Sequence, residues 1–233
     1  MATLDEILQR HAVWRGGALS CAPPAVPSGF AELDRELPGG GWPVGALTEI
    51  LADRAGIGEL QLVLPALAAL SWAGRRIVWL APPHLPYAPA LAAAGIDLAH
   101  LVAVRAPGPR DALWAAEQVL RSGSCHALLA WLPGARYEEL RRLALAAESG
   151  EAWAALFRPL KDAQAPSPAC LRLSLQPAGE ALGIHVLKRR GAPAVPLRLS
   201  LKRPVHALGR TAFPAPAAGH ARDDRRLGVP VHA

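Results

Sequence analysis

Cysteine is scarce in this chain, and it never occurs in an arrangement that would form a disulfide framework or a metal site. The 3 Cys are far apart, at Cys21, Cys125 and Cys170, and no C-x-x-C pair occurs. None of the 8 His pairs with Cys or an acid at the spacing of metal ligands. These absences exclude a disulfide-rich secreted scaffold, argue against a metal centre, and are typical of a reducing compartment.

We expect no signal peptide from the sequence, and a long hydrophobic run does not occur in it. The N-terminal sequence MATLDEILQRH contains acids and no extended apolar region. The apolar run at residues 60–73 is too short to span a bilayer, is interrupted by Pro65 and stops at Arg75. With 52% hydrophobic residues the chain has material for a large core. We therefore expect a cytoplasmic protein with one sizeable domain.

Lysine is missing where the layout of the chain would use it to bind phosphate. Residues 46–51 predict a strand, residues 52–58 a loop with glycines, and residues 59–73 a helix, which is the layout of a phosphate-binding P-loop. That loop needs the pattern G-x-x-x-x-G-K-[ST]. No Lys occurs between Gly39 and Arg75.

The two frames in which the loop can be read both fail. The Lys position falls on Gly58 or Ile57, and the hydroxyl position falls on Glu59 or Gly58. Asp53 and Glu59 would add negative charge where phosphate must bind. We therefore expect no nucleotide cofactor, and we regard as a vestigial nucleotide loop the residues Ala52, Asp53, Gly56, Ile57, Gly58 and Glu59.

Basic residues outnumber acidic ones, with 25 Lys and Arg against 19 Asp and Glu and a net charge of +6. This charge permits contact with nucleic acid or with an acidic partner. A genome that favours arginine codons produces the same charge, so the excess does not identify a partner.

Short apolar runs alternate with helical patterns through the middle of the chain. Strands are expected at residues 46–51, 76–81, 101–105, 127–132 and 153–157, and helices at 59–73, 87–94, 111–122 and 137–149. Continuously apolar strands between helices predict an α/β fold with a mostly parallel sheet and helices on both faces. After residue 169, three segments alternate apolar and polar residues without a helix between them, which predicts an antiparallel meander at one edge.

Three regions are expected along the chain. Residues 1–27 combine a helix at 4–15 with a Pro-rich linker, and residues 28–203 form the folded domain, whose first helix Ser28 would cap. Residues 204–233 contain few large apolar groups and predict a disordered basic tail.

Three stretches of the chain resemble a known family. They are SGFAELDRELPGGGWPVGALTEI, PYAPALAAAGIDLAHLVAV and RSGSCHALLAWL, which are similar to the entry to the RecA core and to its second and fourth strand regions. With GIGELQLVLPAL, the chain is identified as a member of the ImuA family, RecA-like accessory proteins grouped with RecA and with the cell-division inhibitor SulA. The resemblance covers roughly residues 28–202 and implies a RecA-like core.

The resemblance also implies that no catalytic residue survives. The carboxylate that activates water in the recombinase falls near Pro83, and the Walker B Asp falls on Trp131. No acid occurs between Ile77 and Ile96, so a small shift of the alignment does not restore the first of these. ATP hydrolysis needs phosphate positioning, Mg²⁺ and an oriented water, so we expect a protein that is not an enzyme.

The function implied by the resemblance is that of a non-catalytic adaptor in SOS-induced translesion DNA synthesis and mutagenesis. Its implied partners are an inactive Y-family polymerase homologue (ImuB), an error-prone replicative-type DNA polymerase and RecA, with DNA contact left open. A SulA-like inhibitor of cell division is one alternative, and an ATP-binding recombinase or a DNA-binding protein is another.

Candidate contact residues come from exposed positions and basic clusters. Two Trp lie outside the expected core elements, whereas Trp72, Trp79, Trp114, Trp131 and Trp153 are expected to pack inside. The candidates for contact with a partner or DNA are Trp14, Trp42, Arg136, Arg158, Lys161, Lys188, Arg189, Arg190 and Phe213.

Overall fold

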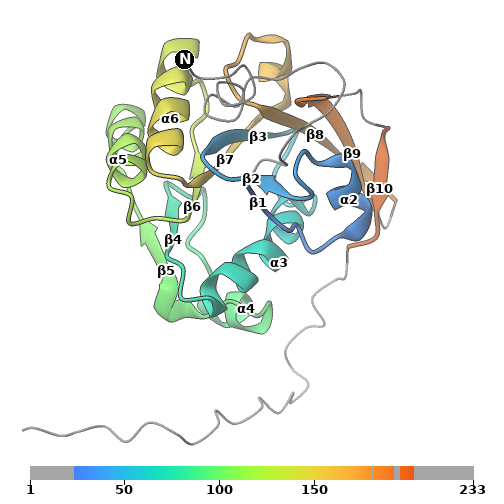
Figure 1. The fold of residues 1–233 in the computed structure, drawn as a ribbon, viewed down its shortest axis with the longest axis horizontal. Helices are drawn as coiled ribbons and strands as arrows, with labels where there is room; N and C mark the ends of the chain where they lie inside the picture. Colours follow the sequence, from blue (N-terminus) through green and yellow to red (C-terminus); the bar gives the residue numbers. More distant parts are fainter. Residues whose placement is uncertain (1–23, 180, 192–194, 202–233) are drawn as a thin grey trace, which may run out of the picture.

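The computed structural model of the chain describes residues 24–179, 181–191 and 195–201. Within these ranges eight strands form one sheet in the order β10-β9-β8-β3-β7-β6-β4-β5, and β1 pairs with β2 beside it (Figure 1). The strands are β1 Ala25–Val26, β2 Trp42–Pro43, β3 Ala46–Ala52, β4 Ile77–Leu80, β5 Leu101–Val104, β6 Ala127–Trp131, β7 Trp153–Pro159, β8 Leu171–Ala178, β9 Ala181–Lys188 and β10 Leu197–Leu199.

Five α-helices and two short 3₁₀ helices connect the strands in the described ranges. They are α2 Ala31–Glu36, α3 Glu59–Trp72, α4 Ala88–Ala93, η1 Leu98–His100, α5 Pro109–Arg121, α6 Tyr137–Ser149 and η2 Leu160–Gln164. Strands and helices alternate from β3 to β7, and β3 is parallel to both of its neighbours, β7 and β8. The pairs β7–β6, β6–β4 and β4–β5 are also parallel. The predicted α/β class with a mostly parallel sheet is thus confirmed.

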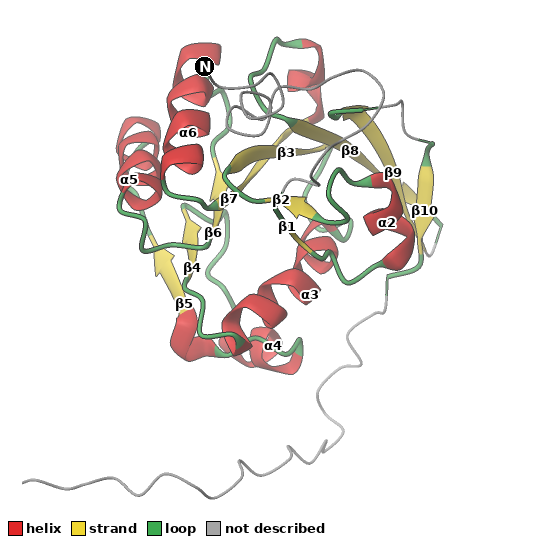
Figure 2. Ribbon diagram, in the orientation of Figure 1, coloured by secondary structure: helices red, strands yellow, loops and turns green. Residues whose placement is uncertain are grey.

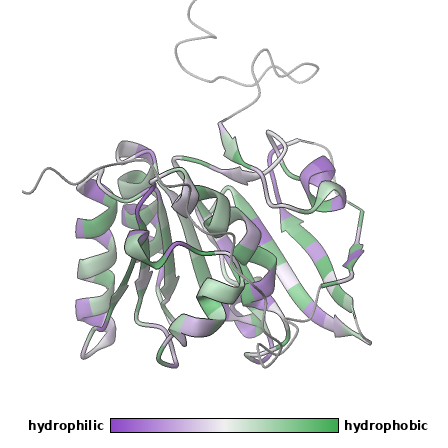
Figure 3. Cartoon of the chain, turned by 90° about the horizontal axis from the view of Figure 1, so that it is seen from below, coloured by the Kyte–Doolittle hydropathy of each residue, from purple (hydrophilic) through white to green (hydrophobic). Residues whose placement is uncertain are grey.

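The sheet is covered on both faces, and successive residues of its strands enter two separate cores. In β6, Leu128 belongs to the core under α5 and α6, whereas Leu129 belongs to the core under α3. This alternation follows from the period of two in a β-strand. Figure 2 shows α5 and α6 together on one side of the sheet, and α3 and α4 on the other. Figure 3 shows apolar residues along the central strands, with polar residues on outward-facing helix surfaces.

The antiparallel meander is confirmed at one edge of the sheet. β8 is parallel to β3 on one side and antiparallel to β9 on the other, and β10 is antiparallel to β9. In β9 the alternating sequence buries Leu182 and Ile184 and leaves His185 exposed, whereas residues 171–175 of β8 are all buried.

Two expectations near the start of the domain are wrong. Residues 1–27 were expected to end in a Pro-rich linker, but Ala25–Val26 pairs with Trp42–Pro43 as a short strand. Ser28 does not cap α2, because Phe30 is the N-cap residue. The Ser28 hydroxyl instead accepts a hydrogen bond from the Phe30 N–H at 3.1 Å, in a local turn before the helix.

Two large residues lie on the opposite side of their helix from the side expected. Trp72 and Trp114 are 74% and 65% exposed, although both were expected in the core. Trp114 lies midway between the buried Ala112 and Ala116, so a helical turn carries it to the opposite face. Trp79 and Trp153 are buried as expected.

No helix in residues 24–179, 181–191 and 195–201 has the length and apolar character needed to cross a membrane. The expected helix at residues 4–15 and the expected tail at residues 204–233 lie outside the described residues.

Candidate functional site

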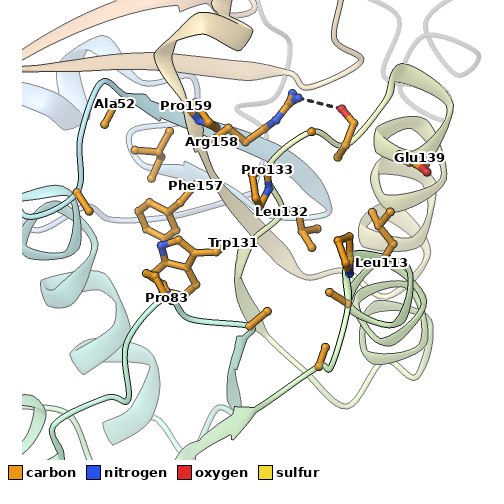
Figure 4. A pocket seen from close by; sticks show the side chains of 18 of the residues that line it. Ala52, Pro83, Leu113, Trp131, Leu132, Pro133, Glu139, Phe157, Arg158 and Pro159 are labelled. Carbon is orange, nitrogen blue, oxygen red and sulfur yellow. Dashed lines mark hydrogen bonds between the residues drawn. The ribbon is translucent and has the colours of Figure 1, made fainter.

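A cavity of about 740 Å³ lies where four neighbouring parallel strands end. Residues at or just beyond the ends of β3, β4, β6 and β7 line it, together with the beginnings of α5 and α6 (Figure 4). Parallel strands place their carboxyl ends at one edge of a sheet, and ligands of open α/β sheets bind in the crevice outside that edge. The cavity is therefore the first candidate for a functional site.

An aromatic wall forms one side of this cavity. The rings of Trp131 and Phe157, at the ends of β6 and β7, stack with centroids 4.7 Å apart. Trp79 meets Trp131 edge-on from the core side, with centroids 5.8 Å apart. Because Trp131 is held by a ring on each side, the wall is a rigid apolar surface facing the cavity.

The glycine loop, residues 52–59, closes another side of the cavity. The Glu59 carboxylate accepts hydrogen bonds from the backbone N–H groups of Gly56, Ile57 and Gly58, at 2.8, 3.0 and 3.1 Å. Gly56 and Gly58 have φ of 81° and 113°, so the backbone turns in a way that aims successive N–H groups inward. Such N–H groups at a helix start bind anions, and here the anion is the side chain of the first residue of α3.

Sequence reasoning missed this role of Glu59 and treated the acid only as a source of repulsion. An acid at the first helical position after a glycine loop is the signal that could have indicated it, because its short reach covers the preceding N–H groups. Of the residues assigned to the vestigial nucleotide loop, Ala52, Asp53 and Glu59 line the cavity. Gly56, Ile57 and Gly58 hold the carboxylate.

A buried ion cluster lies directly behind the cavity and was also missed. Glu49, in the middle of β3, has no exposed surface, and its two oxygens accept from Arg158 Nη1 at 2.6 Å and Arg172 Nε at 2.5 Å. Arg158 also donates to the Ala135 carbonyl at 2.9 Å and forms an ion pair with Asp162 at 2.8 Å. Strands β7 and β8 flank β3, so the two arginines reach the same carboxylate from opposite sides.

Two candidate contact residues are corrected by their burial. Arg158 was a candidate for contact with a partner or DNA, but its side chain is 3% exposed and pairs with Glu49 and Asp162. Trp42 was expected at an interface, but it is fully buried and stacks on Trp153 with ring centroids 5.1 Å apart. Burial of so large an apolar side chain against the Trp153 ring lowers the free energy more than leaving it exposed to solvent would.

The remaining candidates do not form one site. Arg136 lines the cavity with a side chain 83% exposed and pairs with Glu139 at 3.2 Å. Lys161 is exposed in η2. Lys188 donates to the Ser167 carbonyl at 2.8 Å, and Arg189 binds Glu36 through its carboxylate and its backbone carbonyl. Arg190 is exposed just after β9, and Trp14 and Phe213 lie outside the described residues.

Both positions at which a recombinase would carry an acid, Pro83 and Trp131, line the cavity. Neither side chain has an ionisable group or a metal ligand. Within the part of the chain that the structure describes, no three or more His, Cys, Asp or Glu residues gather as metal ligands would.

The titratable groups near the cavity and the core have ordinary structural causes for their shifts. A hydrogen bond from the Arg136 backbone N–H, at 2.7 Å, lowers the pKa of Glu139. Burial raises the pKa of the Cys125 thiol to about 12, so this residue is not a nucleophile near neutral pH. Burial also lowers the pKa of the adjacent His126.

Fold and site together define a mixed α/β protein whose sheet-edge cavity is apolar and whose anion-binding loop is filled by its own glutamate. The profile of a family described as "Cell division inhibitor SulA" matches residues 45–154. Relatives named cell division inhibitor SulA, from Yersinia pestis (strain Pestoides F) and Yersinia pseudotuberculosis serotype O:1b (strain IP 31758), are 33% identical over 115 residues. The aligned region is 49% of this chain and 68% of theirs, and the chain belongs to the SulA family. The crystal structure of SulA from Pseudomonas aeruginosa aligns at 26% identity over 48% of this chain and 97% of that chain, with a TM-score of 0.42.

The assignment to the ImuA family is therefore wrong, and so is the translesion-synthesis adaptor role that it implied. The expected partners, ImuB, an error-prone polymerase and RecA, are withdrawn with it. A mostly parallel α/β sheet serves many functions, and missing catalytic residues indicate only which chemistry a protein lacks. The alternative of a SulA-like inhibitor is the one that the family supports, and it agrees with a protein that is not an enzyme.

Proposed function

We propose that this protein inhibits cell division by binding a protein of the division machinery, without a catalytic step. The observation that carries the proposal is the match of residues 45–154 to a family of cell division inhibitors. Those residues include β3, the glycine loop and the Trp131 side of the cavity. In this proposal the protein acts in the cytoplasm, where its partner assembles.

Inhibition by binding alone is supported by the chemistry of the glycine loop. Glu59 already uses the N–H groups that would hold a phosphate, and Gly58 stands where a P-loop has its Lys. Pro83 and Trp131 supply no carboxylate for Mg²⁺ or water. Purified protein is expected to show no ATP hydrolysis.

The partner surface that we propose is the carboxyl-edge face, defined by Arg54, Leu85, Tyr87, Arg105 and Arg110. Leu85 and Tyr87 are 73% and 71% exposed, which is unusual for large apolar side chains so near each other in sequence. The three arginines are exposed and make no ion pair among the described residues. A second groove, which contains Leu85 and Arg105, shares Ala81 and Pro83 with the main cavity. Aromatic and Arg side chains around apolar pockets are typical of binding hot spots.

We further propose that the sheet is a RecA-like core within a domain of residues 28–203, with residues 1–27 and 204–233 as its flanking regions. The succession of β3, glycine loop and α3 supports this relationship, because the same order of elements makes a P-loop.

Controlled expression in a rod-shaped bacterium tests the function. Cells that produce the chain are expected to grow into long filaments while mass increase continues, because division stops and elongation does not. Cell length is measured by microscopy at matched protein levels. Normal cell length at a protein level that saturates the effect of a known inhibitor would overturn the proposal.

Matched variants test the proposed surface separately. Leu85→Asp is expected to abolish filamentation, since it places a charge on the apolar part of the carboxyl-edge face. Leu145→Ser, at an exposed leucine on α6, is the control and should filament like the parent chain. Equal filamentation by both variants, with equal abundance, would show that the partner binds elsewhere while the function stands.

A further inference from the structure

The cavity at the carboxyl edge favours an uncharged, apolar occupant. Its walls are formed largely by Trp131, Phe157, Leu113, Leu132 and Pro133 (Figure 4). Four arginines, residues 54, 110, 136 and 158, and three acids, residues 53, 59 and 139, also line it. The charges nearly cancel, and Glu59, Glu139 and Arg158 already have partners within the chain. Burying a further charge there would be unfavourable, whereas an apolar group would gain contact with the aromatic wall.

The two terminal parts of the chain, residues 1–23 and 202–233, lie outside the described residues, and they join the domain at opposite edges of the sheet. The N-terminal part joins at Pro24, whose carbonyl accepts from the Val44 N–H at 3.0 Å, just before β3 begins. β3 then runs for 7 residues to the cavity edge. At about 3.3 Å per residue, roughly 20 Å separate that junction from the cavity.

The C-terminal part joins on the cavity side. The described chain ends at Leu201, which packs on the α3 core and lies against the glycine loop. A Cβ built on Gly58 would lie only 2.5 Å from Leu201 Cδ1. Other residues of the same loop, 52–55 and Glu59, line the cavity. Residues 202–233 therefore start one loop away from it.

The sequence of this C-terminal part contains one segment suited to such a cavity. Residues 211–219 read TAFPAPAAG and carry no charge, whereas basic residues precede them and Asp223 and Asp224 follow. Phe213 is the only Phe, Tyr or Trp in residues 202–233. Pro-rich segments lie in aromatic-lined grooves at a low entropic cost, because proline already restricts the backbone.

We propose that residues 211–216 of the same chain dock in the cavity, with the Phe213 ring against Trp131 and Phe157. Phe213 lies twelve positions after Leu201, and this stretch can span about 40 Å when extended. A connection of this length gives an effective concentration on the order of 1 mM. An intrinsic dissociation constant of about 0.1 mM then keeps the segment docked roughly 90% of the time.

The docking itself needs no partner and is tested on the purified chain, so its failure is distinct from a failure of the proposed function.

Photocrosslinking in the full-length chain tests the docking directly. Phe213 is replaced by the photoreactive p-benzoylphenylalanine, the dilute protein is irradiated, and the crosslinked peptides are identified by mass spectrometry. Crosslinks are expected chiefly within residues 106–113 and 131–136. The matched control carries the same photoreactive residue in place of Val229 and should give several-fold less crosslinking there.

Hydrogen exchange supplies a second readout that does not depend on crosslinking. In Phe213→Ala, amides of residues 106–113 and 131–136 should exchange roughly tenfold faster, as follows from 90% occupancy, with an unchanged melting temperature. Leu113→Trp, which places a larger ring in the cavity, should remove the Phe213 crosslinks while leaving the chain folded.

Three outcomes would overturn the proposal. The first is equal crosslinking to the cavity from positions 213 and 229, and the second is an exchange rate in Phe213→Ala that matches the parent chain. The third is crosslinks that join isotopically labelled and unlabelled chains in a mixture, because these would assign the contact to a second copy.

Discussion

Glu49 and Glu59 belong to the same strand-loop-helix unit, yet the chain satisfies their charges in opposite ways. Glu49 is fully buried in β3 and binds two guanidinium groups that come from β7 and β8. Glu59 is half-buried at the start of α3 and binds three backbone N–H groups of its own loop. The first carboxylate joins three strands, and the second holds one turn.

This difference indicates that the Glu49 cluster contributes to the stability of the whole sheet, whereas Glu59 fixes only the conformation of the glycine loop. A buried carboxylate that loses its place leaves two arginines uncompensated in the core, so the cost extends across the sheet. A carboxylate that binds N–H groups near the surface can be replaced by water, so the cost stays local. Glu49 belongs to the part of the sheet where the parallel strands meet the antiparallel edge, and Glu59 belongs to the rim of the cavity.

The largest effect is expected for Glu49→Ala. Removal of the carboxylate leaves Arg158 and Arg172 buried without their partner and should lower the free energy of unfolding by about 3–5 kcal/mol. Urea denaturation measures this change. The control is Glu117→Ala, whose partners Arg121 and Arg142 are each 59% exposed and which should cost less than about 1 kcal/mol. Similar losses in both variants would contradict the distinction between the two kinds of pair.

A smaller effect is expected for Glu59→Ala. The N–H groups of Gly56, Ile57 and Gly58 then turn to water, so the free energy of unfolding should fall by about 1 kcal/mol. Amide exchange at these positions should accelerate while exchange in β3 stays unchanged. Glu59→Asp is the matched variant, because its shorter side chain keeps the charge but cannot reach all three groups. A loss as large as that of Glu49→Ala would show that the loop is not a local unit.

The smallest effect concerns Glu139, whose pKa is lowered chiefly by the N–H group of Arg136. A group with a depressed folded-state pKa stabilises the protein above its unfolded pKa and loses that contribution as the pH falls through the folded value. Glu139→Gln should therefore be less stable than the parent chain near neutral pH, and the difference should shrink below about pH 4.5. Urea denaturation across this range measures it. A difference that does not vary with pH would indicate that the amide keeps the hydrogen bond and that charge contributes nothing.

Much of the fold could be predicted because its signals are local. The continuous apolar runs at β4, β6 and β7 and the alternating pattern at β8 and β9 show in short windows of sequence, and the structure confirms them. The helices α3 and α6 likewise begin at the residues expected from their patterns. Local periodicity does not say which face of a helix meets a neighbour, so Trp72 and Trp114 were misplaced.

The candidate site could be predicted less well because its contacts join distant residues. Glu49 meets Arg158 and Arg172 across separations of 109 and 123 positions, and nothing near Glu49 in the sequence marks it as a paired charge. Trp42 looks like a loop residue until Trp153 stacks on it from β7. The absence of a P-loop lysine is evident from the sequence. That the Glu59 carboxylate binds the N–H groups of the loop is evident only from the structure.

The sequence by itself determined the α/β class, the parallel core with an antiparallel edge and the lack of a P-loop lysine, because each depends on residue type and short-range order. Comparison of the sequence with known proteins identifies the SulA family, although the motifs considered first indicated the ImuA family. Only the tertiary structure decided that Arg158 is a core residue, that Trp42 is buried, and that an apolar cavity opens where β3, β4, β6 and β7 end. Those features depend on which strands become neighbours, and strand order is a long-range property that no local window of the chain contains.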